Sequence, residues 1–197
     1  MLSSLLPFQA RFILASFTAV SINLPLDCQS IHDKKEVTVE ILHTNDMHSH
    51  FAGSKNGSAC ITENDCEGGY GRVAEYVKEV KERNPNAIFL DAGDQFQGSL
   101  LYVNYHSPLV GKITDKMRYD FATFGNHEFD YRSQGLANML KAAKSSGETL
   151  PEIVVCNVDW DSMEKAGLND GQKQIQSAFE TYGVKDYVMV QKGDVKI

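Results

Sequence analysis

The sequence has few cysteines, fewer basic than acidic residues and no long hydrophobic run. Its 197 residues include four cysteines, which are too few for a small fold built on disulfides. Lys and Arg number 19 against 26 Asp and Glu, and a chain with a net charge of −7 is a poor candidate for binding a nucleic-acid polymer. No apolar run reaches the roughly 18 residues of a transmembrane helix, so we expect no membrane span in this chain.

The composition is otherwise that of a globular protein. Hydrophobic residues make up 42% and charged residues 23%, values close to the average, which excludes disorder, collagen or coiled coil for the whole chain. The length is sufficient for one domain of ordinary size or a little more.

The N-terminal segment differs from the rest of the chain. Its only charged residues up to position 30 are Arg11 and Asp27, and Arg11 precedes a mostly apolar stretch from Phe12 to Leu26. A positive charge before a short apolar segment is typical of a secretory signal. We therefore predict a signal peptide over residues 1–30 and a secreted or otherwise extracytoplasmic protein, in the periplasm or at the cell surface. The alternative is a hydrophobic N-terminal segment that stays attached.

Short apolar strands alternate with helices over residues 31–197. Alternating or β-branched apolar residues predict four strands, and apolar residues at helical spacing predict three helices between them. This order is typical of βαβ units and predicts an α/β fold with a mainly parallel sheet covered by helices on both faces. The strands are expected at 37–42, 87–90, 120–124 and 153–158.

The ends of the helices are predicted from capping residues. The second helix is expected to begin at Ser107-Pro108, with serine as the N-cap and proline at the first helical position. Ser133 is expected to cap the third helix. The first helix begins near Gly71, and its apolar face is expected to contain Val73, Tyr76, Val77 and Val80.

Three polar clusters directly follow three of the predicted strands. They are His43–His48, Asp91–Phe96 and Gly125–Asp130. In a parallel sheet, functional groups collect beyond the carboxyl ends of the strands, so we expect these clusters to meet along one edge. Each short motif alone is more often structural, but three of them in order at strand ends predict one site.

The residues of these clusters are suited to binding metal. Asp46 and His48 alternate, so an extended strand end can turn both to one side, and their ligand types suit Zn²⁺, Mn²⁺ or Fe²⁺. Gly93 permits a sharp turn that would let Asp94 sit deep and bridge two ions, and Asn126 offers an amide oxygen to the second ion. Two ions about 3.5–4 Å apart can activate a water and hold phosphoryl oxygens.

A histidine and a carboxylate complete the predicted site. His127 would stand beside the metals, and Asp130, three residues later, can accept a hydrogen bond from its ring and favour the charged form. A protonated His127 could stabilise the charge of the transition state or protonate the leaving oxygen.

These motifs resemble those of the calcineurin-like metallophosphoesterase superfamily and, within it, of the secreted 5′-nucleotidase/apyrase family. The narrower resemblance rests on Leu42–Asp46 with His48, on the run DAGDQFQG at 91–98 and on GNHEFD at 125–130. It extends over residues 37–197. It implies a metallophosphoesterase-type sheet layered with helices and the metal-dependent hydrolysis of nucleotide phosphate esters.

The resemblance also implies a role for each site residue. Asp46 and His48 would bind the first metal, Asp94 would bridge, and Asn126 would bind the second metal and the substrate phosphate. His127 would contact the substrate and form a catalytic dyad with Asp130. The expected cofactors are two divalent ions, with zinc favoured and manganese, magnesium and calcium as alternatives, and the expected partner is a nucleotide substrate.

Two parts of the family pattern have no counterpart in this sequence. The later histidine blocks that complete both metal sites are missing, and so is the C-terminal substrate domain. We therefore expect residues 31–197 to be the N-terminal part of a catalytic domain, with an incomplete sheet, weak metal binding and little or no turnover. The residues Val195-Lys196-Ile197 are interpreted as the start of a further strand; the alternative is a short C-terminal strand. The alternative function is a catalytically incomplete product that binds nucleotide or metal without turnover.

Two interpretations concern the cysteines. Cys60 and Cys66 lie close together in a polar loop, where a secreted protein would close them into a small disulfide; the alternative is two free thiols. Cys156 lies within the last predicted strand and is expected to be a small buried hydrophobic residue.

Overall fold

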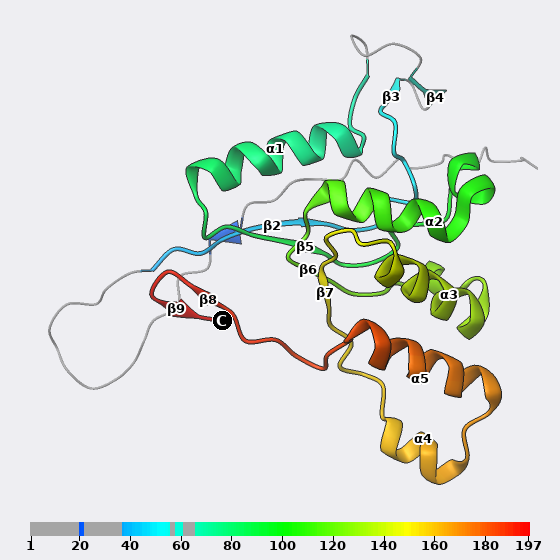
Figure 1. Ribbon diagram of the computed structural model, residues 1–197. Coiled ribbons are helices and arrows are strands. Elements are labelled where there is room, and N and C mark those ends of the chain that lie inside the picture. Colours follow the sequence, from blue (N-terminus) through cyan, green and yellow to red (C-terminus); the bar gives the residue numbers. More distant parts are fainter. Residues whose placement is uncertain (1–19, 22–36, 56–57, 61–65) are drawn as a thin grey trace, which may run out of the picture.

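A computed structural model describes residues 20–21, 37–55, 58–60 and 66–197 (Figure 1). Most of the predicted signal peptide therefore lies outside the described residues. The main sheet has five strands in the order β1-β2-β5-β6-β7, of which β2, β5, β6 and β7 are parallel and β1 is antiparallel at the edge. This confirms the predicted α/β class. The strands are β1 (Val20–Ser21), β2 (Glu40–Thr44), β5 (Ile88–Asp91), β6 (Phe121–Ala122) and β7 (Glu152–Ile153).

A helix connects each pair of neighbouring parallel strands. In Figure 1, α1 lies on one side of the sheet and α3 and α5 lie on the other. Among the described residues, no helix combines the length and the apolar character needed to cross a membrane. The helices are α1 (Tyr70–Arg83), α2 (Leu100–Met117), α3 (Arg132–Ser145), α4 (Trp160–Ala166) and α5 (Asp170–Tyr182).

Buried apolar side chains form two clusters. One cluster joins α1 to the sheet and to the end of α2, with Leu42 and Phe89 almost fully buried and Phe89 stacked on Tyr119 at 4.3 Å between ring centroids. The other joins α3, α5 and the first turns of α2, around Leu136 and Ala178. Burial of these faces holds the helices against the sheet and so fixes where the strands end.

Three predictions about helices are wrong. The third helix begins at Arg132 with Tyr131 at its N-cap, so Ser133 lies within α3 and does not cap it. The second helix begins at Leu100 and not at Ser107, because Ser99 accepts a hydrogen bond from the backbone N–H of Tyr102 at 3.5 Å and caps the helix earlier. Pro108 therefore lies within α2. The ring of Tyr76 is exposed, so the buried face of α1 is formed by Tyr70 and three valines.

Three of the four predicted strands are shorter than expected, and all four have different ends. β2 runs to Thr44 because Thr44 pairs with Asp91 of β5, whereas β7 comprises only Glu152 and Ile153. Cys156 therefore follows the strand and is exposed, which corrects the prediction that it is buried.

Helices α4 and α5 were not predicted, although local signals for both are present. The side chain of Asp159 accepts a hydrogen bond from the backbone N–H of Ser162 at 2.9 Å and caps α4. Asn169 and Gln172 form a capping box at the start of α5, and Gly183, with a φ of 92°, follows its last turn.

Two short hairpins lie outside the main sheet. β3 (Ser54–Lys55) pairs with β4 (Ser58–Ala59), and the following loop contains the Cys60–Cys66 disulfide, with a Cα–Cα distance of 5.6 Å. The predicted disulfide is thus confirmed. At the other end, β8 (Gln191–Lys192) pairs with β9 (Val195–Lys196), so the C-terminal strand forms its own hairpin.

Candidate metal centre

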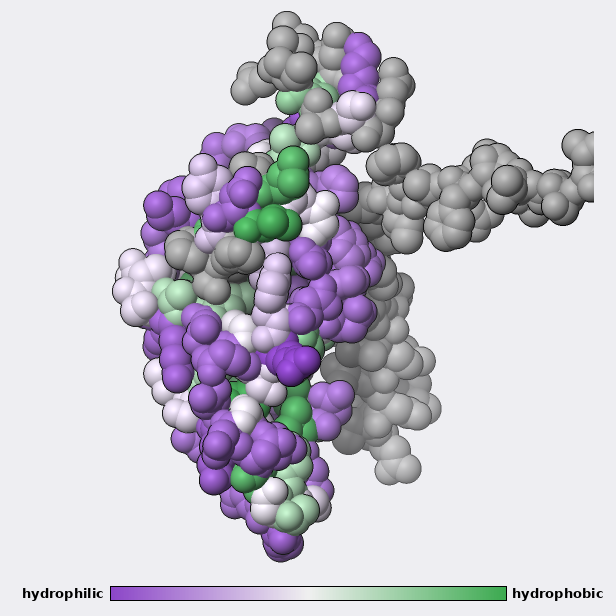
Figure 2. All heavy atoms as spheres, turned by 90° about the vertical axis from the view of Figure 1, so that its right-hand side faces the viewer, coloured by the Kyte–Doolittle hydropathy of each residue, from purple (hydrophilic) through white to green (hydrophobic). Residues whose placement is uncertain are grey.

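The three polar clusters form adjacent loops at the carboxyl ends of β2, β5 and β6. Figure 2 views the molecule from the side on which these strands end and shows a mainly hydrophilic surface with a few small apolar areas. Backbone hydrogen bonds align the first two loops, from the N–H of Asp46 to Gly93 O and from the N–H of His48 to Asp94 O, both at 3.0 Å. The expected convergence of the clusters along one edge is therefore present.

The predicted ligands in these loops have an unusual backbone conformation. The φ angles of Asp46, His48 and Asp94 are 52°, 44° and 52°, in the left-handed region that L residues other than glycine rarely adopt. Such conformations persist only where the surroundings enforce them, and they cluster at functional sites. Three of them at one sheet edge support a functional role for this edge.

Three potential ligands come together, one from each loop. The ligand atoms of His48, Asp94 and His127 lie within 4.8 Å of one another, and the two imidazole rings are 5.0 Å apart between centroids. Asp94 is buried, with 8% of its surface exposed, and its Oδ1 accepts a hydrogen bond from the backbone N–H of His127 at 2.9 Å. One carboxylate and two imidazoles form a donor set that fits a divalent transition-metal ion.

Hydrogen bonds orient both imidazole rings. Nδ1 of His127 donates to Oδ2 of Asp130 at 2.8 Å, and Nδ1 of His48 donates to the carbonyl oxygen of Gln97 at 3.3 Å. Nε2 of each ring is therefore the nitrogen left for a metal or a substrate. The hydrogen bond with Asp130 raises the pKa of His127 and lowers the pKa of Asp130, as expected from their spacing.

Two further residues, Asp46 and Asn126, are predicted ligands. Asp46 is exposed; one of its carboxylate oxygens accepts a hydrogen bond from the amide of Asn45 at 2.6 Å, and the other is 3.9 Å from Nε2 of His48. Asn126 is exposed and directly precedes the short helix η2 (His127–Phe129). The carboxylate of Asp46 thus lies near the imidazole of His48, and Asn126 stands at the start of η2, directly before His127.

Sequence reasoning missed the structural role of Glu128. Its carboxylate is buried and accepts hydrogen bonds from the backbone N–H groups of Asp94, Gln95, Phe96 and Gly125. Glu128 is part of the motif GNHEFD and directly follows the predicted catalytic histidine. The sequence does not show that its carboxylate accepts hydrogen bonds from backbone N–H groups. The one available signal was that Glu128 was the only acidic residue of this motif without an assigned role.

Asp91 is a second buried carboxylate beneath the site. It accepts hydrogen bonds from Oγ1 of Thr44 at 2.5 Å and from the backbone N–H of Gly93 at 2.9 Å. Burial raises the pKa of Asp91 to about 6 despite these hydrogen bonds. This carboxylate links the end of β2 to the turn that precedes Asp94.

We expect Asp91→Asn to change how stability depends on pH. Because the pKa of Asp91 is raised from 3.8 to about 6 in the folded chain, folding favours its protonated form, and that contribution is lost as the pH rises through 6. Between pH 4.5 and pH 7, wild type should lose roughly 2 kcal/mol of unfolding free energy relative to the variant. Urea unfolding in metal-free buffer measures this difference, and parallel pH profiles would contradict it.

A comparison with family models identifies the family of this chain. The model described as calcineurin-like phosphoesterase matches residues 39–190, which include all three loops. The chain belongs to the calcineurin-like phosphoesterase family. Its sheet and helices are those of the metallophosphoesterase fold, as the resemblance implied, and members of the family are phosphohydrolases that use divalent metals.

Relatives of this phosphoesterase chain are nucleotidases and apyrases. It is 41% identical to human 5′-nucleotidase over 106 residues, 53% of this chain and 18% of that protein. It is 36% identical to an apyrase of Tabanus yao over 131 residues, 66% of this chain and 22% of that protein. The solved structure of a 5′-nucleotidase precursor from Thermus thermophilus matches with a TM-score of 0.59 and 27% identity, over 80% of this chain and 27% of that one.

The matched relatives are much longer than this chain. It spans about a fifth of the curated proteins and about a quarter of the solved structure. What this chain shares with them is therefore the part of the phosphoesterase domain that contains the three loops.

Proposed function

We propose that this chain is part of a metal-dependent phosphohydrolase that acts on nucleotides, as a 5′-nucleotidase or an apyrase does. The observation that carries the proposal is the convergence of His48, Asp94 and His127, with Asp130 behind His127, at the carboxyl ends of three parallel strands. Phosphoester hydrolysis by the family supports the reaction class. The names of the relatives support a nucleotide as the substrate.

The proposed roles are those that the family resemblance implies for each side chain. His48 and Asp94 would hold an ion with Asp46, and Asp94 and Asn126 would hold a second, with zinc as the expected metal. Bound ions of this kind supply an activated water and neutralise phosphoryl oxygens. His127, with Nδ1 held by Asp130, would use Nε2–H to stabilise the charge on the phosphoryl group or to protonate the leaving oxygen of the nucleoside.

The proposed location is outside the cytoplasm. The Cys60–Cys66 disulfide supports it, because disulfides persist in oxidising compartments. Related proteins named as snake venom 5′-nucleotidase agree with a secreted product. The segment over residues 1–30 would then act as a signal peptide.

A second candidate function is binding of a metal or nucleotide without turnover. It is favoured by the exposed position of Asp46, which lies outside the group of three ligands. With fewer ligands, an ion would be held more weakly and the phosphoryl group would be less well oriented.

One pair of measurements distinguishes the two functions. Zinc binding is measured by isothermal titration of the metal-free chain, and phosphate release is measured with AMP and ADP in the presence of zinc. Zinc binding with phosphate release from either of these supports the hydrolase. Zinc binding without phosphate release supports the second function, and the absence of zinc binding contradicts both as metal-dependent functions.

A further inference from the structure

We propose that Glu128 is a positioning residue, whose carboxylate fixes the loop that carries Asp94 relative to the loop that carries Asn126 and His127. The inference rests on the metal centre of the proposed function and adds to it a residue outside the predicted ligands and the catalytic dyad. Glu128 itself acts through backbone groups and would touch neither metal nor substrate.

The hydrogen bonds of Glu128 join two loops that are far apart in the sequence. Oε2 accepts from the backbone N–H of Asp94 at 3.0 Å and from that of Gly125 at 2.7 Å, so a single oxygen atom bonds to both loops. Oε1 accepts from the N–H groups of Gln95 at 3.1 Å and Phe96 at 3.5 Å. A carboxylate can accept all four because it has acceptor sites only.

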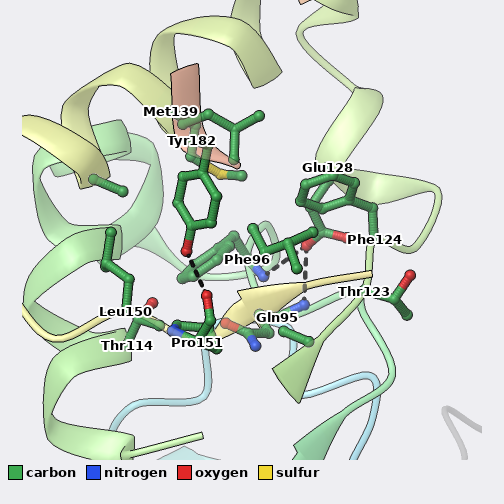
Figure 3. Close-up of a pocket in the computed structure, with 14 residues that line it drawn as sticks. Gln95, Phe96, Thr114, Thr123, Phe124, Glu128, Met139, Leu150, Pro151 and Tyr182 are labelled. Carbon is green, nitrogen blue, oxygen red and sulfur yellow. Dashed lines mark hydrogen bonds between the residues drawn. The ribbon is translucent and has the colours of Figure 1, made fainter. Parts of the chain in front are cut away.

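Burial makes these hydrogen bonds hard to replace. Glu128 is 7% exposed and borders a cavity of about 40 Å³ whose other walls are mainly apolar side chains, among them Phe124 and Met139. Figure 3 shows its carboxylate with hydrogen bonds to the backbone nitrogens of Gln95 and Phe96. Asp94, Gln95 and Phe96 are buried as well, so the loss of a charged acceptor for their N–H groups would be costly.

The same contacts extend directly to the proposed ligands. Asp94 is bound to Glu128 through its N–H, and its side-chain Oδ1 accepts the N–H of His127, the residue before Glu128. These two hydrogen bonds join the loop of Asp94 to the loop of His127 and Glu128 in both directions. They hold Asp94 at its φ of 52° and fix the backbone of His127 next to the carboxylate of Asp94. The distance between the carboxylate of Asp94 and the imidazole of His127 therefore depends on Glu128.

The test compares Glu128→Gln with Asp115→Asn. Both wild-type residues are carboxylates that are 7% exposed and accept hydrogen bonds from backbone N–H groups. Asp115 lies in the last turn of α2 and accepts from the N–H of Thr149, which belongs to none of the three loops of the site. In Glu128→Gln, the new amide would turn an NH₂ group toward donors that now bond to an oxygen, whichever way it is oriented. Binding of Mn²⁺ is measured by calorimetry, and thermal unfolding of the metal-free chains gives the loss of stability.

We expect both variants to lower the unfolding temperature, but only Glu128→Gln to weaken Mn²⁺ binding, by about 10- to 100-fold. The Mn²⁺ affinity of Asp115→Asn should stay within about twofold of wild type, because substitutions at distant sites usually interact only weakly. Equal Mn²⁺ affinities of wild type and Glu128→Gln would overturn the proposal. If Glu128→Gln does not fold, Glu128→Asp replaces it, since it keeps the charge and shortens the side chain; an affinity equal to wild type would again overturn the proposal.

A readout without metal separates this proposal from the proposed function. Amide hydrogen exchange of the metal-free chains should show a joint loss of protection in Glu128→Gln at the four amides that bond to Glu128, those of Asp94, Gln95, Phe96 and Gly125. The amide of Phe89 in β5 should keep its protection. If wild type binds no Mn²⁺, the metal centre is contradicted, and the exchange data alone decide on Glu128. Unchanged protection of the four amides would overturn the positioning role in either case.

Discussion

Asp94→Asn is expected to weaken binding of zinc or manganese to this chain by more than about 100-fold, beyond the effect of losing a residue that only orients a ligand. Asp94 is the carboxylate of the three-residue group and, in the proposed function, the ligand shared by both ions. An asparagine has almost the same shape, and its Oδ1 can still accept the N–H of His127, so the loops should stay in place. The variant removes the negative charge that an ion requires.

Calorimetric titration with zinc checks this expectation. The matched control is Asp170→Asn, which removes the same charge from a fully exposed side chain at the start of α5 and should leave zinc affinity unchanged. Thermal unfolding of the metal-free proteins shows whether the fold is kept. Zinc affinity of Asp94→Asn equal to that of wild type would exclude Asp94 as a ligand and, with it, the bridging role.

Gly93→Ala should cost roughly 3 to 5 kcal/mol of unfolding free energy, because backbone strain and overpacking, each worth about 1–3 kcal/mol, act at the same position. Gly93 has a φ of 98°, which an alanine rarely adopts, and a Cβ there would overlap the backbone of Phe124 and Gly125. The closeness of these two loops is what brings Asp94 to His127. We therefore expect the variant to lose metal binding as well as stability.

Substitutions at two other glycines separate the effect of backbone strain from that of overpacking. Gly147→Ala has a positive φ of 75° but open space around a Cβ, so it should cost about 1–2 kcal/mol from the backbone alone. Gly71→Ala lies in the first turn of α1 with nothing near a Cβ and should stabilise the helix by about 0.5–1 kcal/mol. Urea unfolding gives all three values, and a loss in Gly93→Ala no larger than in Gly147→Ala would show that the loops can separate without cost.

Much of the fold could be predicted from local sequence. The three valines of α1 recur at helical spacing, and all three are buried in the structure. The second helix was misplaced because Ser107-Pro108 is a good start signal in isolation, whereas Ser99 caps the helix that actually forms. Strand ends were uncertain for a related reason: pairing with a neighbour ends a strand, and the neighbour is unknown from the strand's own residues.

Much of the candidate site was predictable too, for a reason of chemistry. His127 and Asp130 are three residues apart, and such a spacing across a short helix brings an imidazole to a carboxylate without help from the rest of the chain. Asp94 and His48 could be named because their motifs follow two of the three strands whose ends carry polar clusters, and three such clusters in order predict one site. The role of Glu128 could not be predicted, because its partners are backbone N–H groups, which carry no signature in the sequence. The role of Asp91 could not be predicted either, because one of its partners is Thr44, 47 residues away in the sequence.

The sequence by itself determined the α/β class, the alternation of the parallel strands with the helices that connect them, and the residue types of the site. Only the tertiary structure decided that His48, Asp94 and His127 lie within 4.8 Å of one another while Asp46 stays exposed beside them. The reason is that ligand distances depend on the register between β2, β5 and β6, and that register is set by buried carboxylates and close glycine contacts between loops more than 30 residues apart.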